Sequence, residues 1–383
     1  MACRVADAGW RPGAADGWRR TARDRGEPPA GLRTIRRVDN RRLAVLVAGV
    51  TTAVLAVASL SIPVGYVALS PTTPTNTLGA DPGNPGHPVI VIAGTTYPSK
   101  GRLDLTTVSE SPRLSLGAAL VDWLRDDTSV IPYSVDHPKG MSDSQVQQMG
   151  EQEIASSKQD APVAAFGELG LPLMITVNDV TTGSKADGLL QKGDVLTSVQ
   201  GAPVDALDST QQALRSVAPG AVVQVGLRRA GQAMTVAVTT VAASTGDGVA
   251  RVARLGVDVQ VATARSVTIN LSDVIGPSAG MMFALGVIDA LTPDDLTGGR
   301  TIAGTGTIDE SGAVGPIGGI QQKVHGARNV GASVFLVPAD NCDEAKAAGV
   351  KGIELVRIPQ TGGLHAAHLA LEAIRAGHPV TTC

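Results

Sequence analysis

Gly276-Pro277-Ser278-Ala279-Gly280 is the stretch that decides both the fold and the chemistry of this 383-residue chain. A serine between glycines and small residues leaves its hydroxyl open to an incoming carbonyl. The apolar run Met281–Ile288 follows directly and predicts a buried helix. Ser278 would then lie at the start of that helix, where backbone N–H groups and the positive end of the helix dipole can stabilise an oxyanion. The stretch therefore predicts a serine nucleophile.

A serine nucleophile needs a base, and the candidate is Lys323 in Gly318-Gly319-Ile320-Gln321-Gln322-Lys323. A lysine among apolar neighbours can lose its proton near neutral pH and then accept one from a hydroxyl. Ser-Lys pairs are a known variant of the serine triad. His325, two residues further on, is the alternative base. A second interpretation is a Gly/Ser turn before a core helix, with an unrelated surface lysine.

These residues belong to a longer series of motifs that resembles the proteolytic domain of Lon-type proteases. The matching blocks follow in order as Gly276–Gly280, Thr301–Gly306, Val314–Lys323, Gly326–Ala332 and Val337-Pro338. The similarity to the membrane-anchored, PDZ-containing Lon-like proteases of bacteria is closer still. The resemblance implies Ser278 as nucleophile and Lys323, rather than His325, as general base. It also implies that Thr305 hydrogen-bonds the lysine amine and that Gly276 and Ala279 support the serine.

One position departs from the family pattern. Many ATP-dependent Lon proteases carry an acidic residue three positions before the serine, where this chain has Ile275. Asp273 lies two residues further back and is the nearest carboxylate on that side. The departure concerns the electrostatic surroundings of the pair rather than the pair itself.

No cofactor is expected from the sequence. The chain has no Gly-x-x-x-x-Gly-Lys-Ser/Thr motif, so we expect no nucleotide-driven motor. His365 and His368 lie one helical turn apart, but no neighbouring cysteine or glutamate cluster completes a metal site. Aromatic residues make up 2% of the chain, which argues against a surface that stacks nucleic-acid bases.

The N-terminal region predicts a single membrane anchor. Residues 1–42 hold 11 arginines and 5 acidic residues and predict a disordered basic tail. Residues 43–69 carry no charge, and Leu43–Ile62 is long enough to cross a bilayer. The positive-inside rule places the tail in the cytoplasm and the rest of the chain outside. The alternative is a cleaved signal peptide.

The three cysteines divide across this predicted membrane. Cys3 would face the cytoplasm, whereas Cys342 and Cys383 would face an oxidising exterior where a disulfide is permitted. The alternative is two unpaired thiols.

The rest of the chain predicts a mixed α/β (α+β) proteolytic domain in two parts. Residues 70–88 are rich in Thr, Pro, Asn and Gly and predict a linker. Residues 89–160 would form the first part and a connecting helix, since Gly101–Thr107 resembles the opening of a Lon proteolytic domain. Residues 243–383 would form the main part.

The interruption, residues 161–242, resembles a PDZ domain. Its signature is Leu190-Gln191-Lys192-Gly193-Asp194-Val195-Leu196-Thr197-Ser198-Val199-Gln200-Gly201, followed by a predicted strand pair. PDZ domains bind extended peptides along a sheet edge and hold a terminal carboxylate in a backbone nest. Gly170-Leu171 is the candidate for that loop. The alternative is an ordinary β domain with a hairpin turn at Gly193-Asp194.

Together these features predict a membrane-anchored, ATP-independent serine endopeptidase that captures envelope proteins through its PDZ module. The expected partners are protein or peptide substrates and the membrane, with an oligomer as an open option. Two other functions compete with this hypothesis. One is a non-catalytic PDZ scaffold on a protease-like fold, and the other is a processing enzyme resembling signal peptidase. The intact set Ser278, Lys323 and Thr305 favours the endopeptidase over the scaffold.

Overall fold

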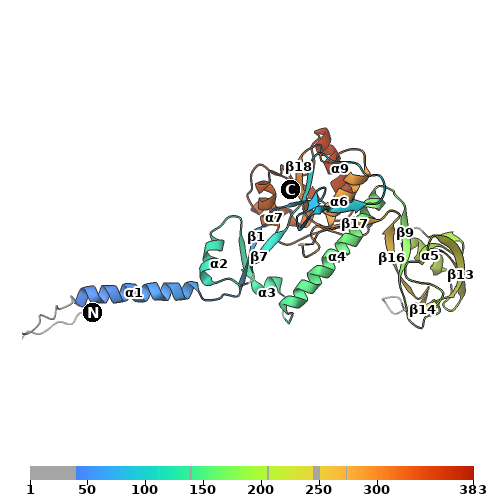
Figure 1. Cartoon of the computed structure of the whole chain (residues 1–383), viewed down its shortest axis with the longest axis horizontal. Helices are drawn as coiled ribbons and strands as arrows, with labels where there is room; N and C mark the ends of the chain where they lie inside the picture. Colours follow the sequence, from blue (N-terminus) through green and yellow to red (C-terminus); the bar gives the residue numbers. More distant parts are fainter. Residues whose placement is uncertain (1–39, 112, 138–139, 205–206, 245–250, 273) are drawn as a thin grey trace, which may run out of the picture. The chain divides into compact units, whose positions relative to one another are not determined.

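The computed structural model describes residues 40–383 except 112, 138–139, 205–206, 245–250 and 273 (Figure 1). Residues 1–39 of the predicted basic tail, including Cys3, therefore lie outside the described residues, and residues 40–42 belong to the first helix. The chain falls into two compact units that divide between Ala56 and Val57. Helix α1 (Asn40–Leu60) supplies the described part of the first unit, and its last turn belongs to the second. By length and composition α1 is able to cross a membrane.

The helical segment ends earlier than the predicted anchor, residues 43–69. After α1, Tyr66–Pro71 forms strand β1, in which Val67 is fully buried. Strand β1 pairs antiparallel with β7 (Val108–Ser111) and β8 (Ser129–Pro132). The uncharged run therefore contains two elements, because Pro63 cannot continue a helix and the residues after it pair as a strand.

The predicted linker, residues 70–88, is folded, and that prediction was wrong. Thr77 and Asp81 are buried, and the Thr77 hydroxyl donates a hydrogen bond to the Leu103 carbonyl (3.0 Å). Three short strands lie in this segment: β2 (Thr75–Asn76), β3 (Ala80–Asp81) and β4 (Asn84–Pro88). Thr, Asn, Gly and Pro favour tight turns as much as flexible linkers, so composition alone did not separate the two.

The part of the chain that carries Ser278 and Lys323 is built on a mostly parallel five-stranded sheet. Its strand order is β2, β6 (Arg102–Leu105), β18 (Thr301–Gly304), β21 (Val334–Pro338) and β22 (Glu354–Ile358). All of β21 is buried, as expected for a parallel strand covered on both faces. Strand β6 pairs in parallel with β18, so residues about 200 positions apart share one sheet. Strand β5 (Ile90–Ile92) likewise pairs with β17 (Val267–Ile269).

Helices cover this sheet and complete its core. They are α4 (Asp143–Glu168), α6 (Gly280–Leu291), α7 (Ile320–Asn329), α8 (Cys342–Ala347) and α9 (Gly363–Ala376). Every residue of α6 from Gly280 to Asp289 is buried. One apolar cluster joins α6 to Ile154 and Phe166 of α4 and to Leu371 of α9. Smaller elements of this part are α2 (Leu116–Trp123), α3 (Tyr133–Asp136), β19 (Thr307–Ile308), β20 (Val314–Gly315) and the 3₁₀ helix η1 (Ala339–Asn341).

A second apolar cluster belongs to the PDZ-like module. Its sheet runs in the order β13 (Gln232–Thr239), β12 (Val222–Arg229), β10 (Val195–Val199), β9 (Leu173–Val180) and β16 (Val257–Thr263), with β11 (Ala202–Pro203) beside β10. Helix α5 (Leu207–Arg215) and the pair β14 (Val241–Ser244) and β15 (Arg251–Arg254) accompany it. Leu196 and Val225 are buried in this cluster.

The edges of this module differ from the predicted 161–242. Ala161, Ala164 and Phe166 pack in the catalytic core, because α4 continues unbroken to Glu168. At the other end β16 joins the module's sheet, although the predicted boundary placed it in the main part of the proteolytic domain, residues 243–383. By packing, the module therefore comprises about residues 173–263.

Candidate active site

Ser278 lies two residues before α6 and is half-buried. Gly276 turns the chain toward the helix with a φ of +89°, a conformation that favours glycine. The helix start is less open than the sequence suggested, because the Met281 N–H donates to the Gly306 carbonyl (3.1 Å). Ser278 borders a cavity of about 360 Å³, whose other lining residues are Pro277, Thr307, Pro316, Ile317 and Gly318. A substrate chain has room at this cavity.

Lys323 lies in the first turn of α7 and is only 3% exposed. Its Nζ donates to the Thr305 Oγ1 (3.3 Å). Burial away from water lowers the pKa of the Lys323 ammonium to about 7. At neutral pH a large fraction of this amine is therefore uncharged and able to accept a proton.

Thr305 connects the lysine to the serine loop. Its hydroxyl donates to the Ser278 carbonyl oxygen (2.9 Å) and accepts from Lys323 Nζ. The same Ser278 carbonyl accepts a second hydrogen bond, from the Gly306 N–H (2.8 Å). The hydroxyl is thus committed as a donor to the serine loop, which leaves its lone pairs for the amine.

Replacing Thr305 by Val should slow peptide cleavage by about tenfold to a hundredfold, the equivalent of one or two lost hydrogen bonds. The midpoint of the pH–rate profile should also fall, because the charged lysine loses its acceptor. Thr305→Ser should restore both properties, and Thr301→Val, at the start of β18, serves as the matched control. An unchanged rate and midpoint in Thr305→Val would reduce Thr305 to a packing residue.

Helix α4 supplies contacts to the serine loop that the sequence analysis missed. The Gly276 N–H donates to the Gly150 carbonyl (3.0 Å), and the Ser157 hydroxyl donates to the Pro277 carbonyl (3.0 Å). A Cβ on Gly150 would come within 2.3 Å of the Ile275 Cγ2. A glycine within a predicted polar helix was the available signal of such a close approach.

Ile275, which stands where many relatives carry an acid, therefore packs against α4. Asp273 lies outside the described residues. Among the described residues, the Lys323 amine donates to the Thr305 hydroxyl rather than to a carboxylate.

Two other sequence candidates have different roles. His365 and His368 both contact Glu168, at 3.0 and 2.8 Å, and the described residues contain no group of three or more side chains that could hold a metal ion.

The loop Gly170-Leu171 follows α4. The Gly170 and Leu171 N–H groups donate to the carbonyls of Gly167 and Phe166. This loop closes the end of α4 and has no N–H left for a carboxylate, so we drop it as the peptide-binding loop.

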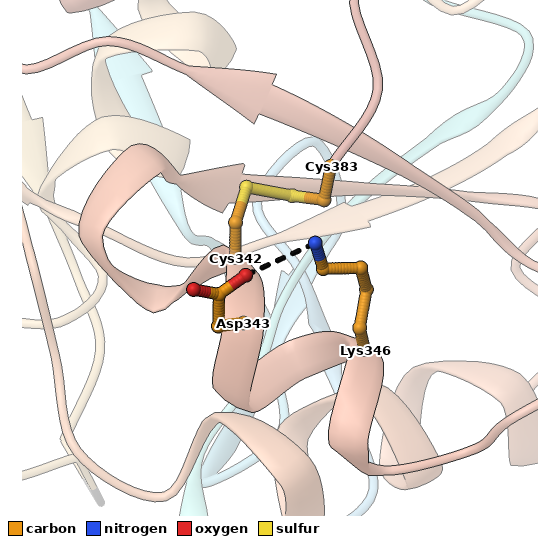
Figure 2. The surroundings of a disulfide bond; sticks show 4 residues. All are labelled: Cys342, Asp343, Lys346 and Cys383. Carbon is orange, nitrogen blue, oxygen red and sulfur yellow. Dashed lines mark ion pairs between the residues drawn. A yellow bond between two sulfur atoms is a disulfide. The ribbon is translucent and has the colours of Figure 1, made fainter.

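Cys342 and Cys383 form a disulfide in the structure, with their Cα atoms 5.2 Å apart (Figure 2). Lys346 and Asp343 form an ion pair beside it (3.0 Å). Cys342 belongs to an apolar cluster with Ile320 and Val324 of α7. The disulfide therefore links Cys383 to the apolar cluster on which α7, the helix that carries Lys323, packs.

Comparison with known proteins agrees with this geometry. Residues 217–352, which include Ser278, Thr305 and Lys323, match the family model for the Lon protease (S16) C-terminal proteolytic domain. This segment resembles a Lon-type proteolytic domain, although its first part overlaps strands of the PDZ-like module. Residues 148–240 match the PDZ domain family model. The chain is thus similar to a Lon-type proteolytic domain in one region and to a PDZ domain in another.

The curated relatives match only a short segment of this chain. Lon protease 2 of Bacillus subtilis is 35% identical over 83 residues, 22% of this chain and 14% of that protein. Lon protease 2 of Herpetosiphon aurantiacus and Lon protease 1 of Sorangium cellulosum are each 46% identical over 66 residues, 17% of this chain and 8% of those proteins. The chain therefore spans a small part of the curated relatives it matches.

Solved PDZ structures match the module at low identity. The PDZ domain of an SdrC-like protein from Listeria monocytogenes is 16% identical, with a TM-score of 0.20 over 22% of this chain and 85% of that one. The corresponding domain from Listeria innocua is 17% identical, with a TM-score of 0.20 over 23% and 93%. The PDZ assignment rests on the family model and not on these structures.

Proposed function

We propose that this chain is an ATP-independent serine endopeptidase that uses Ser278 as nucleophile and Lys323 as general base. The observation that carries the proposal is the buried Lys323 amine, whose pKa is lowered to about 7 and which shares Thr305 with the serine loop. The Lon-type domain supports a protease function, and the pair supplies the chemistry for it.

In the proposed reaction the Ser278 Oγ attacks a peptide carbonyl carbon while neutral Lys323 takes the hydroxyl proton. Collapse of the tetrahedral intermediate breaks the C–N bond, and Lys323 gives that proton to the leaving amine. A water molecule then attacks the acyl-enzyme ester and Lys323 accepts its proton. The second collapse breaks the C–Oγ ester bond, Lys323 returns the proton to the Ser278 Oγ, and the product leaves as a carboxylic acid that ionises in water.

The anchor and the module decide which substrates reach this site. Helix α1 would hold the enzyme in the membrane, with the arginine-rich N-terminal side in the cytoplasm. The PDZ module would capture exposed chain segments of envelope proteins. Since the chain carries no phosphate-binding loop, the expected targets are flexible or damaged proteins that need no forced unfolding.

The full chain, purified in detergent, should degrade an unfolded protein without nucleotide, and ATP with magnesium should leave the rate unchanged. A chain of wild-type sequence that binds peptides but does not cleave them would favour the PDZ scaffold. A reproducible stimulation by ATP would contradict the motor-free mechanism.

Excising the PDZ module tests substrate capture separately from chemistry. Leu173 and Thr263 are register partners of β9 and β16, so the two ends of the module lie one strand spacing apart. Replacing residues 173–263 with a short Gly/Ser bridge should leave short-peptide cleavage within about twofold. Cleavage of proteins should fall about tenfold or more, because the local concentration of captured chain is lost.

The matched control is the excision of residues 161–242. It removes Ala161, Ala164 and Phe166 from the catalytic core, so we expect this variant to misfold and to lose both activities. A folded 173–263 deletion that still degrades proteins at the wild-type rate would rule out a capture role for the module.

A further inference from the structure

Helix α2 exposes an apolar surface with no protein partner in the described structure. None of its eight residues is buried. Leu120, Val121, Trp123 and the C-cap residue Leu124 are 47%, 61%, 72% and 80% exposed. Contiguous large apolar side chains of this kind usually mark a surface that contacts a partner or a membrane.

The backbone fixes where this helix begins. The Leu116 N–H donates to the Ile62 carbonyl (2.8 Å), and the Val64 N–H donates to the Leu114 carbonyl (2.9 Å). Leu60 packs so closely on Gly117 that a Cβ there would come within 2.9 Å of the leucine side chain. Helix α2 thus starts against residues 60–64, in the same compact unit as the last turn of α1.

This position places α2 beside the end of the apolar helix. Ile62 follows the last residue of α1 by two positions, or at most about 7 Å of extended chain. If α1 crosses a bilayer, residues 60–64 emerge at its surface, and α2 emerges with them. The charged residues Arg125, Asp126 and Asp127 follow only after Leu124.

The composition of α2 suits that location. Asp122 is its one charged residue, and Trp123 carries the indole that is enriched at membrane–water interfaces. Interfacial helices place their apolar face in the boundary between headgroups and acyl chains, and the exposed apolar side chains of α2 would fit that boundary. A protein partner would need a second surface, whereas the bilayer is already present at residue 62.

We propose that α2 is a second membrane contact, which lies in the outer surface of the bilayer with Leu120, Val121, Trp123 and Leu124 among the lipids. The inference rests on the proposed anchoring through α1. Its consequence is that the catalytic unit is held at the lipid surface by two elements, the spanning helix and the interfacial one. The occupant of the apolar face is lipid, and not a second copy of the chain.

Trp123 makes the proposal measurable. The chain contains three tryptophans, so Trp10→Phe with Trp18→Phe leaves Trp123 as the remaining tryptophan, which is excited selectively at wavelengths that tyrosine does not absorb. This full-length protein is reconstituted into phosphatidylcholine–phosphatidylglycerol vesicles whose acyl chains are brominated near the glycerol. We expect the protein to float with the vesicles and the emission of Trp123 to be quenched relative to unbrominated vesicles.

Flotation tests the proposed anchoring through α1, whereas quenching of Trp123 tests the proposed contact of α2 with lipid. A protein that fails to float with vesicles contradicts the anchor. A protein that floats but shows no quenching keeps the anchor and overturns the interfacial role of α2. Unquenched, blue-shifted emission that depends on the protein-to-lipid ratio would instead show a second copy on this face, which also overturns it.

Charged substitutions on α2, compared with a control substitution on α9, test the same lipid contact by mutation. Leu120→Glu with Leu124→Glu should abolish most of the bromine quenching while flotation and short-peptide cleavage persist, because both side chains are exposed. Leu369→Glu replaces a comparably exposed leucine (48%) on α9 and should leave quenching unchanged. Equal quenching in the double variant and in Leu369→Glu would contradict the proposal.

Discussion

Ser278→Ala should lower kcat/KM for an unfolded protein substrate by at least about 10³-fold, because a nucleophile and its base act as one unit. The folded state should survive, since alanine fits any site that a half-buried serine occupies. The measurement is peptide hydrolysis by the purified full chain, with thermal unfolding recorded for both proteins. Ser156→Ala, on the exposed side of α4, is the matched control and should retain full activity.

Turnover by Ser278→Ala within tenfold of the wild type would remove this serine as the nucleophile. A loss of activity accompanied by unfolding would leave the rate uninterpretable, so Ser278→Cys provides a second measurement. Its thiol should form a covalent adduct with a peptide aldehyde even if turnover is slow, and the absence of any adduct would also contradict the assignment.

Lys323→Arg should be as inactive as Ser278→Ala, because a guanidinium cannot give up its proton in this pH range. In the wild type, kcat/KM should rise with pH through one ionisation near 7 and then level off. The protonated amine cannot accept the serine proton, so the acidic side is the inactive one. At pH 6 the rate should be about tenfold below the plateau.

Lys346→Arg changes a surface lysine that pairs with Asp343 and should alter neither the rate nor the profile. A wild-type profile that is flat between pH 6 and 8.5 would contradict Lys323 as the base. An active Lys323→Arg with an unshifted profile would point to a different group, with His325 the first to be replaced by Gln.

The sequence was most informative where local pattern and tertiary packing agree. The run Met281–Ile288 predicted a buried helix, and α6 is buried over its first ten residues. The connecting helix expected at the end of residues 89–160 is α4, which continues to Glu168. In these segments composition, period and burial all favour the same structure.

The sequence was least informative where a polar segment gains its structure from distant partners. Residues 70–88 have a linker's composition, yet the side-chain amide oxygen of Asn76 accepts from the Leu103 N–H (3.1 Å) and orders part of this segment. Ser157 was one serine among several in a polar helix until its contact with Pro277 was known. The role of β16 could not be predicted either, because an alternating strand fits either neighbouring sheet.

The pairing of β6 with β18 also governs when the enzyme becomes active during its synthesis. The Thr106 hydroxyl donates to the Gly304 carbonyl across 198 residues, and Ser157 reaches Pro277 across 120. The PDZ core, in contrast, draws on one continuous stretch of chain and can fold as soon as that stretch emerges. Contacts of such long range form late, so the nascent chain carries a folded binding module before it carries a working peptidase. For the exported peptidase proposed above, an export pathway would not be exposed to proteolytic activity until most of the chain had passed through.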